Sequence, residues 1–379
     1  MFHAQLQPGN MPHMLSERGE GYMAAFPSHP EDITPEWLTD RLHKAGLLQR
    51  GNVIGFRWEP IGTGQVGDSA RISLNYDQAG AGPATVAGKF PAANPTSRGT
   101  AAMMGLYTKE VRFYRDLAQQ LDVRVPATYA AEVNDDGSSF VLLFEDLEPE
   151  KEGNQLDSCS FDEACHAIRQ AAALHAPSWK NAAILSLDWL QPQEAVTSQI
   201  RALYPQAQAV FAERYADALE PEFMAVCADL AASDTWLLRN HPKVSLVHGD
   251  FRLDNMLFGI GSGAEPIAIL DWQTLSLGHP MTDIGYFMGC GIGNELRQRY
   301  EAELLDLYCS EMTARGVPLR HDNIWRDYVI GALHGVSTAV FSAAFVERTE
   351  RGDANFLSMA RGACALALEH GSLKMLEEN

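Results

Sequence analysis

The spacing of apolar residues along the chain changes near residue 148. Before that point, short apolar runs predict β-strands, and one run alternates through Ile72 and Leu74 as a half-buried strand does. A helix is expected from Thr34, because Pro35 suits the first helical turn. We expect five strands. The limits of four can be read from the sequence, at residues 56–61, 70–76, 85–90 and 139–144, and a helix is expected over 108–121.

After residue 148 the apolar period becomes helical. Ser160 and Glu163 form a capping-box pattern, and the helix that they begin is expected to reach about His175. Strands followed by helices predict an α+β protein with two lobes. Further helices are predicted over residues 193–216, 221–238, 294–315 and 323–346, and near the C-terminus. The expected division is a tail over 1–30, a strand-rich N-lobe over 31–147 and a helical C-lobe over 148–379.

The composition narrows the choice of partners. The chain has 379 residues and a formal net charge of −20. A surface of that sign repels the phosphates of nucleic acids and anionic membranes, which argues against both as partners. Apolar residues make up 46% of the chain, as in a soluble globular protein. The six cysteines are scattered without a CxxC pair, which favours reduced thiols in the cytoplasm over a disulfide framework or a zinc site.

Two segments of the chain are considered as a signal peptide and as a membrane-spanning helix. The first residues, Met1 to Pro8, lack the basic start and the apolar core of a signal peptide. Tyr328 to Val346 is long enough to span a bilayer and almost uncharged, yet it contains His334 and three hydroxyl residues without a flanking excess of basic residues. We therefore expect a buried core helix there and no membrane insertion.

The strongest chemical signal is the string Val247-His-Gly-Asp250-Phe-Arg-Leu-Asp-Asn255, followed later by Asp271. Two apolar runs with a glycine-rich turn separate Asn255 from Asp271, which predicts a hairpin. Both residues lie eight positions from Gly263, so an antiparallel pairing centred there would place them opposite each other. Oxygen ligands gathered in this way suit Mg²⁺ with phosphate, although Asp and Asn at ordinary turns produce part of the same pattern.

The spacing of His248, Asp250, Asn255 and Asp271 resembles the catalytic loop and metal-binding segment of the aminoglycoside phosphotransferase superfamily. Within it, the chain is similar to the ecdysteroid-kinase-like (choline-kinase-like) branch and to the kinase domains associated with acyl-CoA dehydrogenases. The resemblance implies a bilobal protein-kinase-like fold and an ATP- and Mg²⁺-dependent transfer of phosphate to a small-molecule hydroxyl. It also implies structural roles for His248 and Asp283, the latter bracing the catalytic loop.

The resemblance further assigns individual roles in catalysis. It makes Asp250 the base that orients and deprotonates the acceptor, and Asn255 and Asp271 the ligands of the metal ions. Arg252 lies where protein kinases place a Lys that touches the transferring phosphoryl group, so Arg252 is a second catalytic candidate. An ion pair of Arg252 with Asp254 or another acid is the alternative interpretation.

The first half contains a candidate nucleotide site. Gly62, Gly64 and Gly67 form a GxGxxG string, which also occurs in dinucleotide-binding folds. In those folds a helix follows the loop, whereas residues 70–76 alternate as a strand. Strand, glycine loop and strand form the kinase arrangement, in which the loop covers the nucleotide phosphates. A glycine-rich hairpin without a ligand is the alternative.

Two opposite charges in the first half are expected to pair. Lys89 lies in an apolar strand, where an unpaired ammonium group is costly, and Glu110 lies beside the apolar face of a predicted helix. Their spacing resembles the kinase Lys–Glu pair that presents the Lys to phosphate oxygens, and a purely structural ion pair is the alternative. The family pattern also implies Glu145 and Leu147 as the hinge whose main-chain groups bind adenine.

These residues favour an active small-molecule kinase. A catalytically inactive nucleotide-binding module is disfavoured, because the residues expected to act in catalysis are all present: Lys89, Glu110, Asp250, Asn255 and Asp271. A dinucleotide-dependent oxidoreductase is disfavoured by the strand that follows the glycine loop. A Trp-Gln pair follows Asp271 where protein kinases have Phe-Gly, which argues against a protein substrate.

The acceptor is expected to be apolar, such as a hydroxyacyl-CoA, a sterol or a polyketide. An aminoglycoside-type or choline-type acceptor is the alternative, but kinases that hold polycations need clustered carboxylates, and the acidic residues of the second half are dispersed. An apolar lining from the helix near 328–346 would suit the expected acceptor, although the same helix can simply fill the core. The candidate lining residues are Val329, Ile330, Val336, Val340 and Phe341.

Overall fold

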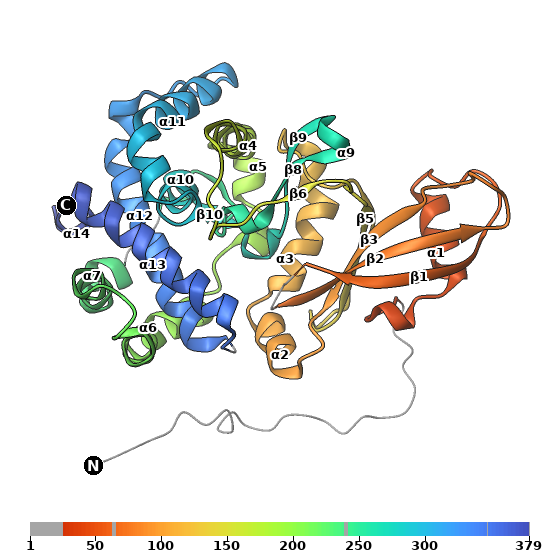
Figure 1. The fold of residues 1–379 in the computed structure, drawn as a ribbon, viewed down its shortest axis with the longest axis horizontal. Coiled ribbons are helices and arrows are strands. Elements are labelled where there is room, and N and C mark those ends of the chain that lie inside the picture. The colour runs from red at the N-terminus through yellow and green to blue at the C-terminus, as the bar shows by residue number, and fades with distance from the viewer. Residues whose placement is uncertain (1–25, 63–65, 239–241, 347, 379) are drawn as a thin grey trace, which may run out of the picture.

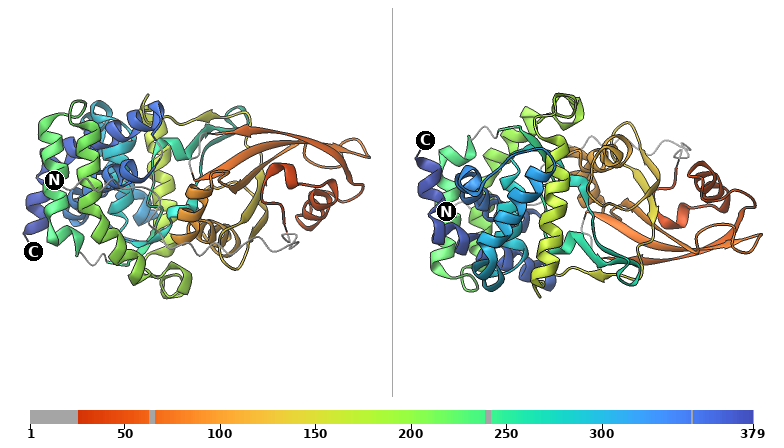
Figure 2. Two further views of the ribbon diagram at one scale, coloured as in Figure 1. Left: turned by 90° about the horizontal axis from the view of Figure 1, so that it is seen from below. Right: turned by 90° about the horizontal axis from the view of Figure 1, so that it is seen from above.

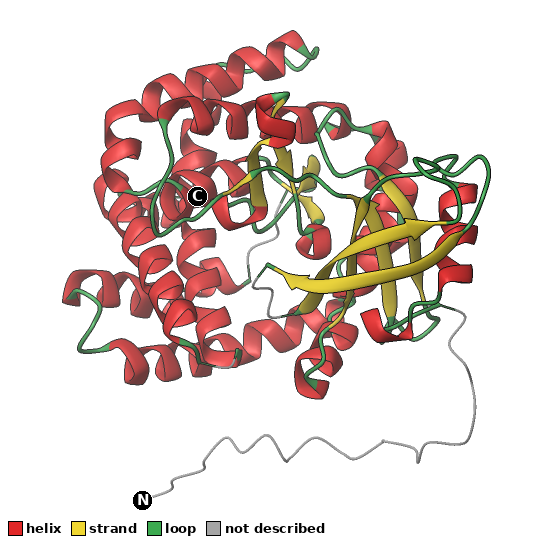
Figure 3. Cartoon of the chain, turned by 45° about the vertical axis from the view of Figure 1, so that its right-hand side comes forward, coloured by secondary structure: helices red, strands yellow, loops and turns green. Residues whose placement is uncertain are grey.

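The computed structural model describes residues 26–62, 66–238, 242–346 and 348–378. The chain forms an elongated molecule with a sheet-rich lobe at one end and a helical lobe at the other (Figures 1 and 2). Colouring by secondary structure shows the same separation, with a few short strands between the helices (Figure 3). The predicted α+β, two-lobed architecture is therefore confirmed.

The N-lobe is built on a five-stranded antiparallel sheet with the order β1-β2-β3-β5-β4. Its strands are β1 (Val53–Ile61), β2 (Gly67–Tyr76), β3 (Thr85–Pro91), β4 (Thr128–Val133) and β5 (Phe140–Glu145). The four bounded predictions are confirmed within a few residues. The fifth strand, β4, has mostly half-buried residues and therefore lacks the apolar run that identified the others.

The helices of the N-lobe differ in part from expectation. Helix α1 (Pro35–Lys44) begins where predicted, and Thr34 caps it by accepting a hydrogen bond from a main-chain N–H. The helix expected over residues 108–121 is confirmed within about two residues: α3 (Leu106–Arg112) continues without a break into a π-helical turn (Phe113–Leu117) and a 3₁₀ turn (Ala118–Gln120). Helix α2 (Pro95–Met103), which precedes it, was not predicted. The sequence pattern missed α2 because Ala101 is its only buried residue.

The C-lobe is helical, and the capping box of Ser160 and Glu163 is present at the start of α4. Ser233 ends one helix and caps the next, so the helix predicted over residues 221–238 is two. The helices are α4 (Phe161–Ser178), α5 (Ala182–Leu185), α6 (Glu194–Tyr215), α7 (Pro221–Ala232), α8 (Asp234–Leu237), α9 (Ile260–Gly263), α10 (Met281–Tyr286), α11 (Asn294–Ala314), α12 (His321–Phe345), α13 (Glu350–His370) and α14 (Ser372–Glu377). The short strands are β6 (Lys151–Glu152), β7 (Ser245–Val247), β8 (Met256–Gly259), β9 (Glu265–Ile269) and β10 (Ser276–Gly278).

Helix α12 is the one helix of the described residues that is long and apolar enough to cross a membrane. Most of its apolar stretch is buried, and it packs against α6, α7, α10, α13 and α14. The expectation of a core helix is therefore confirmed. Val329, Ile330, Val336 and Val340 belong to this packed core, so their proposed place in an acceptor pocket was wrong.

Glycines bring α10 and α12 into backbone contact. A Cβ atom added to Gly331 would lie 2.0 Å from the carbonyl oxygen of Met281, and one added to Gly285 would lie 2.5 Å from the carbonyl carbon of Gly331. Contacts this short are below any van der Waals separation, so a side chain at either position would force the helices apart. The glycines therefore fix the position of α10 relative to α12.

We predict that Gly331→Ala lowers the free energy of unfolding by about 1–3 kcal/mol, the usual cost of overpacking a core. Urea denaturation of the purified protein measures it. Gly99→Ala is the matched control, because nothing lies within 4 Å of its added Cβ in α2, and it should leave the stability unchanged or raise it by up to ~1 kcal/mol. Equal stability of Gly331→Ala and wild type would contradict the close contact.

Candidate active site

The segment between β7 and β8 is held by hydrogen bonds to its main chain. The N–H groups of His248 and Gly249 donate to the carboxylate of Asp283 at 2.7 and 2.9 Å. The His248 ring contacts the carbonyl oxygen of Leu270 at 2.9 Å, and Thr274 donates to the carbonyl oxygen of His248 at 2.8 Å. Gly249 has a φ of 83°, and a Cβ there would lie 2.8 Å from the carbonyl oxygen of Thr274, so only glycine fits.

Asp283 lies where the expected brace of the catalytic loop would be. It is fully buried in α10, and its second neighbour is His175, whose Nε2 lies 3.1 Å from the carboxylate. Burial alone would raise the pKa of Asp283, but the hydrogen bond and charge of His175 and the main-chain N–H of Gly249 lower it below its usual value. A buried anion therefore anchors the loop.

Asp250 receives polar contacts on both carboxylate oxygens. Its Oδ1 accepts a hydrogen bond from the Tyr286 hydroxyl at 2.6 Å and lies 2.9 Å from Nε of Arg252. Its Oδ2 accepts from the Asn255 amide at 2.9 Å, and the same amide donates to the Asp250 carbonyl oxygen at 2.8 Å. Burial acts to raise the pKa of Asp250, but Arg252 and Tyr286 outweigh it and lower the pKa. The carboxylate is therefore ionised at neutral pH.

The hairpin of β8 and β9 has a register one residue away from the predicted one. Met256 pairs with Ile269, and the carbonyl oxygen of Asn255 accepts from the N–H of Leu270 at 2.9 Å. Asn255 therefore faces Leu270, and the expectation that it faces Asp271 was wrong. The loop inside the Ile260–Glu265 bridge has an even number of residues, so the centre of the hairpin falls beside Gly263 and not on it. Asp271 directly follows Leu270 and therefore still lies at the open end of the hairpin, next to the residue that faces Asn255.

Lys89 connects the two lobes. Its ammonium group lies 2.7 Å from the carboxylate of Glu110 on α3 and 3.2 Å from that of Asp271. Burial acts to lower the pKa of Lys89, but the two carboxylates raise it above its usual value, so the group stays charged. The expected Lys89–Glu110 pair is present, and Asp271 is a second partner that we had not predicted.

The glycine string joins β1 to β2, in the expected order of strand, loop and strand. Gly62 has a φ of 71°, which favours glycine. A Cβ at Gly67 would lie 3.3 Å from Cε of Lys89 and 3.1 Å from the carbonyl oxygen of Phe90. Gly64 lies outside the described residues. Gly67 therefore leaves room for the Lys89 side chain beside the loop.

The expected hinge follows β5. The side chain of Glu145 pairs with Arg124 at 2.5 Å, and its N–H donates to the carbonyl oxygen of Ala127 at 2.9 Å. The N–H of Leu147 has no hydrogen-bond partner within the described part of the chain. The Leu147 side chain is buried against Ile260 and Ala268. At Leu147 the chain therefore combines an open main-chain donor with an apolar neighbourhood, which is what a nucleobase requires.

Arg252 is held by an ion-pair network. Beyond its contact with Asp250, its Nη1 lies 3.1 Å from the carboxylate of Asp254 and donates to Oε1 of Gln155 at 2.8 Å. The Gln155 N–H also donates to Asp254 at 3.0 Å. The ion pair of Arg252 with Asp254, which was the alternative interpretation, is therefore present in the structure. The contact of Arg252 with the transferring phosphoryl group stays a prediction.

Sequence reasoning missed several side chains that contact the loop of residues 248–255, among them Tyr286, Gln155 and His334. Nε2 of His334, from α12, lies 2.8 Å from the carbonyl oxygen of Gly249. Tyr286 could have been found from its spacing, because it follows Asp283 by three residues and so lies on the same face of α10. Gln155 and His334 are far from the loop in sequence and carry no comparable signal.

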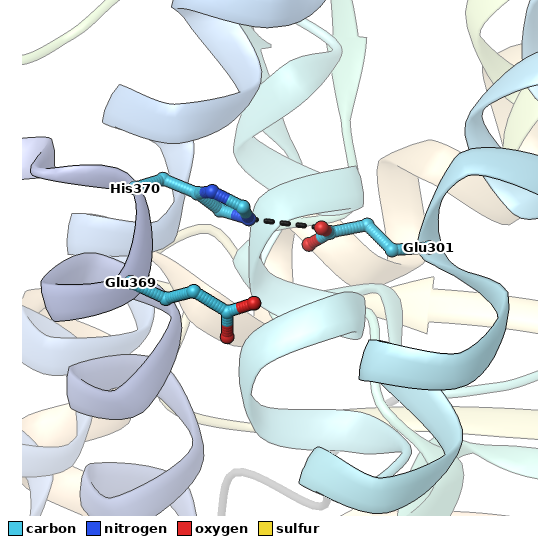
Figure 4. Close-up of side chains that lie close together, drawn as sticks. All are labelled: Glu301, Glu369 and His370. Carbon is cyan, nitrogen blue, oxygen red and sulfur yellow. Dashed lines mark hydrogen bonds and ion pairs between the residues drawn. The ribbon is translucent and has the colours of Figure 1, made fainter.

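A second group of titratable side chains lies between α11 and α13 (Figure 4). Ligand atoms of Glu301, Glu369 and His370 lie within 4.8 Å of one another, close enough for a cation. The buried guanidinium of Arg297 already contacts Glu301 at 3.2 Å and Glu369 at 2.6 Å, while His370 and Tyr328 bind Glu301 at 2.8 and 2.5 Å. The group is therefore an ion-pair network that joins α11 and α13. Arg297 already supplies the positive charge that a bound cation would otherwise provide.

Known proteins resemble this chain in sequence and in fold. In sequence, acyl-CoA dehydrogenase family member 11 of Homo sapiens is 43% identical over 56 residues, and family member 10 of Mus musculus is 46% identical over 54. Each match covers 14% of this chain but only 7% and 5% of those proteins, respectively. In structure, the GDP complex of wild-type aminoglycoside 2'-phosphotransferase-IIIa is similar in fold, with a TM-score of 0.50 and 15% identity over 88% of this chain and 99% of that one.

The sequence model of the phosphotransferase enzyme family matches residues 102–318, which is more than half of the chain. This region contains Glu110, the catalytic loop with Asp250 and Asn255, and Asp271. The match confirms the resemblance that those residues carried. The chain therefore belongs to the phosphotransferase enzyme family and has its kinase-like, two-lobed fold.

Proposed function

We propose that this phosphotransferase transfers the γ-phosphoryl group of ATP, bound with Mg²⁺, to a hydroxyl group of a small molecule. One observation carries the proposal. The side chains of Lys89, Glu110 and Asp271 form one contacting group at the lobe boundary, and Asp250 and Asn255 form another at the start of the same hairpin. Phosphoryl transfer depends on positioning and charge stabilisation, and these are the groups that supply both.

The nucleotide would lie between the glycine loop and the hinge. Lys89 is charged and fixed by two carboxylates, so its remaining N–H can be directed to phosphate oxygens. The Leu147 N–H is an open donor for the base, and Leu147, Ile260 and Ala268 form an apolar cluster beside it. Arg252 is a further cation close to Asp250, where the transferring group would arrive.

The residues present fit Mg²⁺. Two acceptors fix the NH₂ group of Asn255, which turns its amide oxygen away from Asp250, and Asp271 provides a carboxylate next to the Asn255 pairing partner. Both are hard oxygen ligands, which Mg²⁺ prefers. When bound, the ion would neutralise charge on the phosphates. The role of the chain is to hold these two oxygens and to keep Asp250 free for the acceptor.

Asp250 would orient the acceptor hydroxyl and accept its proton. Its lowered pKa keeps it anionic at neutral pH, so it is always able to accept a hydrogen bond. A low pKa also makes it a weak base, which suits phosphoryl transfer because the transition state is loose and the proton moves late. Orientation is therefore the larger part of its contribution.

We propose an apolar, hydroxylated acceptor, with a hydroxyacyl-CoA as the first to test. Phe341 is the one residue of the predicted lining that stays partly exposed, and its ring lies 4.7 Å from that of the exposed Phe345. His334, seven residues before Phe341 on α12, reaches the catalytic loop, so the helix leads from the loop to this aromatic pair. The relatives named as acyl-CoA dehydrogenase family members support the choice of an acyl-CoA.

The function is tested by following ADP release from MgATP with hydroxyacyl-CoA, sterol, choline and aminoglycoside acceptors, and by detecting the product by mass. We expect transfer to an apolar hydroxylated acceptor, and Asp250→Asn should reduce it by ~10²–10⁴-fold with nucleotide affinity nearly unchanged. Asp306→Asn, an exposed acid on α11, is the control. Undiminished turnover by Asp250→Asn would refute its role, and an aminoglycoside kcat/KM above roughly 10⁴ M⁻¹s⁻¹ would refute the acceptor class.

Asp271→Ala should abolish the Mg²⁺ dependence of ATP binding, because the carboxylate that would hold the ion is lost. Calorimetric titration with ATP in the presence and absence of Mg²⁺ measures it. Glu110→Gln removes the other carboxylate that contacts Lys89, so it should weaken binding but retain the Mg²⁺ dependence. An Asp271→Ala variant that still needs Mg²⁺ for ATP binding would show that the ion is held elsewhere.

A further inference from the structure

We propose that Tyr286 is a positioning residue, which locks the carboxylate of Asp250 so that Oδ2 alone faces the acceptor hydroxyl. The inference rests on the proposed function, because it concerns the group that receives the acceptor. It adds a residue outside the catalytic string, contributed by α10.

The contacts of Asp250 divide unequally between its two oxygens. Oδ1 accepts a hydrogen bond from the Tyr286 hydroxyl at 2.6 Å, and Nε of Arg252 lies 2.9 Å from it in an ion-pair contact without hydrogen-bond geometry. Oδ2 accepts a hydrogen bond from the Asn255 amide at 2.9 Å. Because Tyr286 and the guanidinium both lie on the side of Oδ1, the side of the carboxylate that is left for a further donor is that of Oδ2. The acceptor hydroxyl can donate there without displacing a protein group.

Tyr286 is itself held in place. Its side chain is fully buried, and its ring meets the ring of His334 edge-on with centroids 5.3 Å apart. The backbone of Gly335 on α12 lies close to the Tyr286 ring, since even a Cβ added there would come within 3.4 Å of it. Gly285, the preceding residue, lies against the backbone of Gly331. The hydroxyl therefore cannot follow Asp250 if the carboxylate turns.

Tyr286 and Asp283 act on the same loop from one helical turn. They are three residues apart in α10 and so lie on one face of it. Asp283 binds the main-chain N–H groups of His248 and Gly249, and Tyr286 binds the side chain of the next residue, Asp250. The first contact sets the path of the loop, and the second sets the rotation of the carboxylate.

Arg252 alone would not give the same orientation. Its guanidinium also contacts Asp254 and Gln155, and its Nε lies near Asp250 without making a hydrogen bond, so this contact is charge attraction and depends weakly on the rotation of the carboxylate. The Tyr286 hydroxyl is a directional donor, and burial together with the nearby charge of Asp250 raises its pKa well above its usual value. It therefore stays protonated and donates at neutral pH, so it cannot replace Asp250 as the base.

The test is steady-state kinetics of Tyr286→Phe with MgATP and the acceptor found by the panel. We expect kcat to fall on the order of 10-fold to 100-fold, as for the loss of a hydrogen bond to a charged group, with the nucleotide KM unchanged. Tyr328→Phe is the matched control, because Tyr328 is equally buried and donates to Glu301 at 2.5 Å. Its kcat should equal that of wild type.

A pair of isosteric replacements separates positioning from packing and remains available if Tyr286→Phe fails to fold. Replacing Tyr286 by 4-aminophenylalanine keeps a donor at the para position and should restore much of kcat, whereas 4-methylphenylalanine has the same size without a donor and should not. Equal kcat values for these two proteins would overturn the inference. If they are equal while Asp250→Asn is inactive, the inference fails and the proposed function stands. If Asp250→Asn is as active as wild type, both fail.

Discussion

The close backbone contact of α10 with α12 is the constraint on which the proposed active site depends. It brings the Met281 carbonyl oxygen and Gly331 so near that no side chain fits between them. Because α10 carries Asp283 and Tyr286, its position decides where the catalytic loop lies and how Asp250 is turned. Helix α12 adds His334 to the same loop. A contact made of glycines, with no chemistry of its own, thus places the carboxylate of Asp250.

The two largely buried cations of the proposed site, Lys89 and Arg252, are surrounded by acids in the same way. Each cation is shared by two acids: Lys89 contacts Glu110 and Asp271, and Arg252 contacts Asp250 and Asp254. The acids therefore exceed the bases within these two groups. A surplus of negative charge beside fixed oxygen ligands is unfavourable alone and favourable with a divalent cation. The same surplus explains why the lysine and arginine stay charged despite burial.

The sequence predicted the features that depend on local pattern or on motif spacing. The strands with clear apolar runs, the α4 capping box and the Lys89–Glu110 pair are present in the structure. It could not predict features set by tertiary contact. Strand β4 and helix α2 bury too little to show a pattern, and the hairpin register depends on a turn whose centre falls between two residues. Gln155 and His334 lie far from the loop in sequence, so their contacts with it become visible only in three dimensions.

We predict that the loop and the hairpin form one site that holds Mg²⁺ and leaves Asp250 free. A crystal structure with Mg²⁺ and a non-hydrolysable ATP analogue tests it most directly. We predict an ion about 2.0–2.1 Å from the amide oxygen of Asn255 and a carboxylate oxygen of Asp271, with Lys89 on the phosphates and Oδ2 of Asp250 outside the coordination sphere. An ion coordinated by Asp250, or a nucleotide bound away from Lys89, would contradict the account.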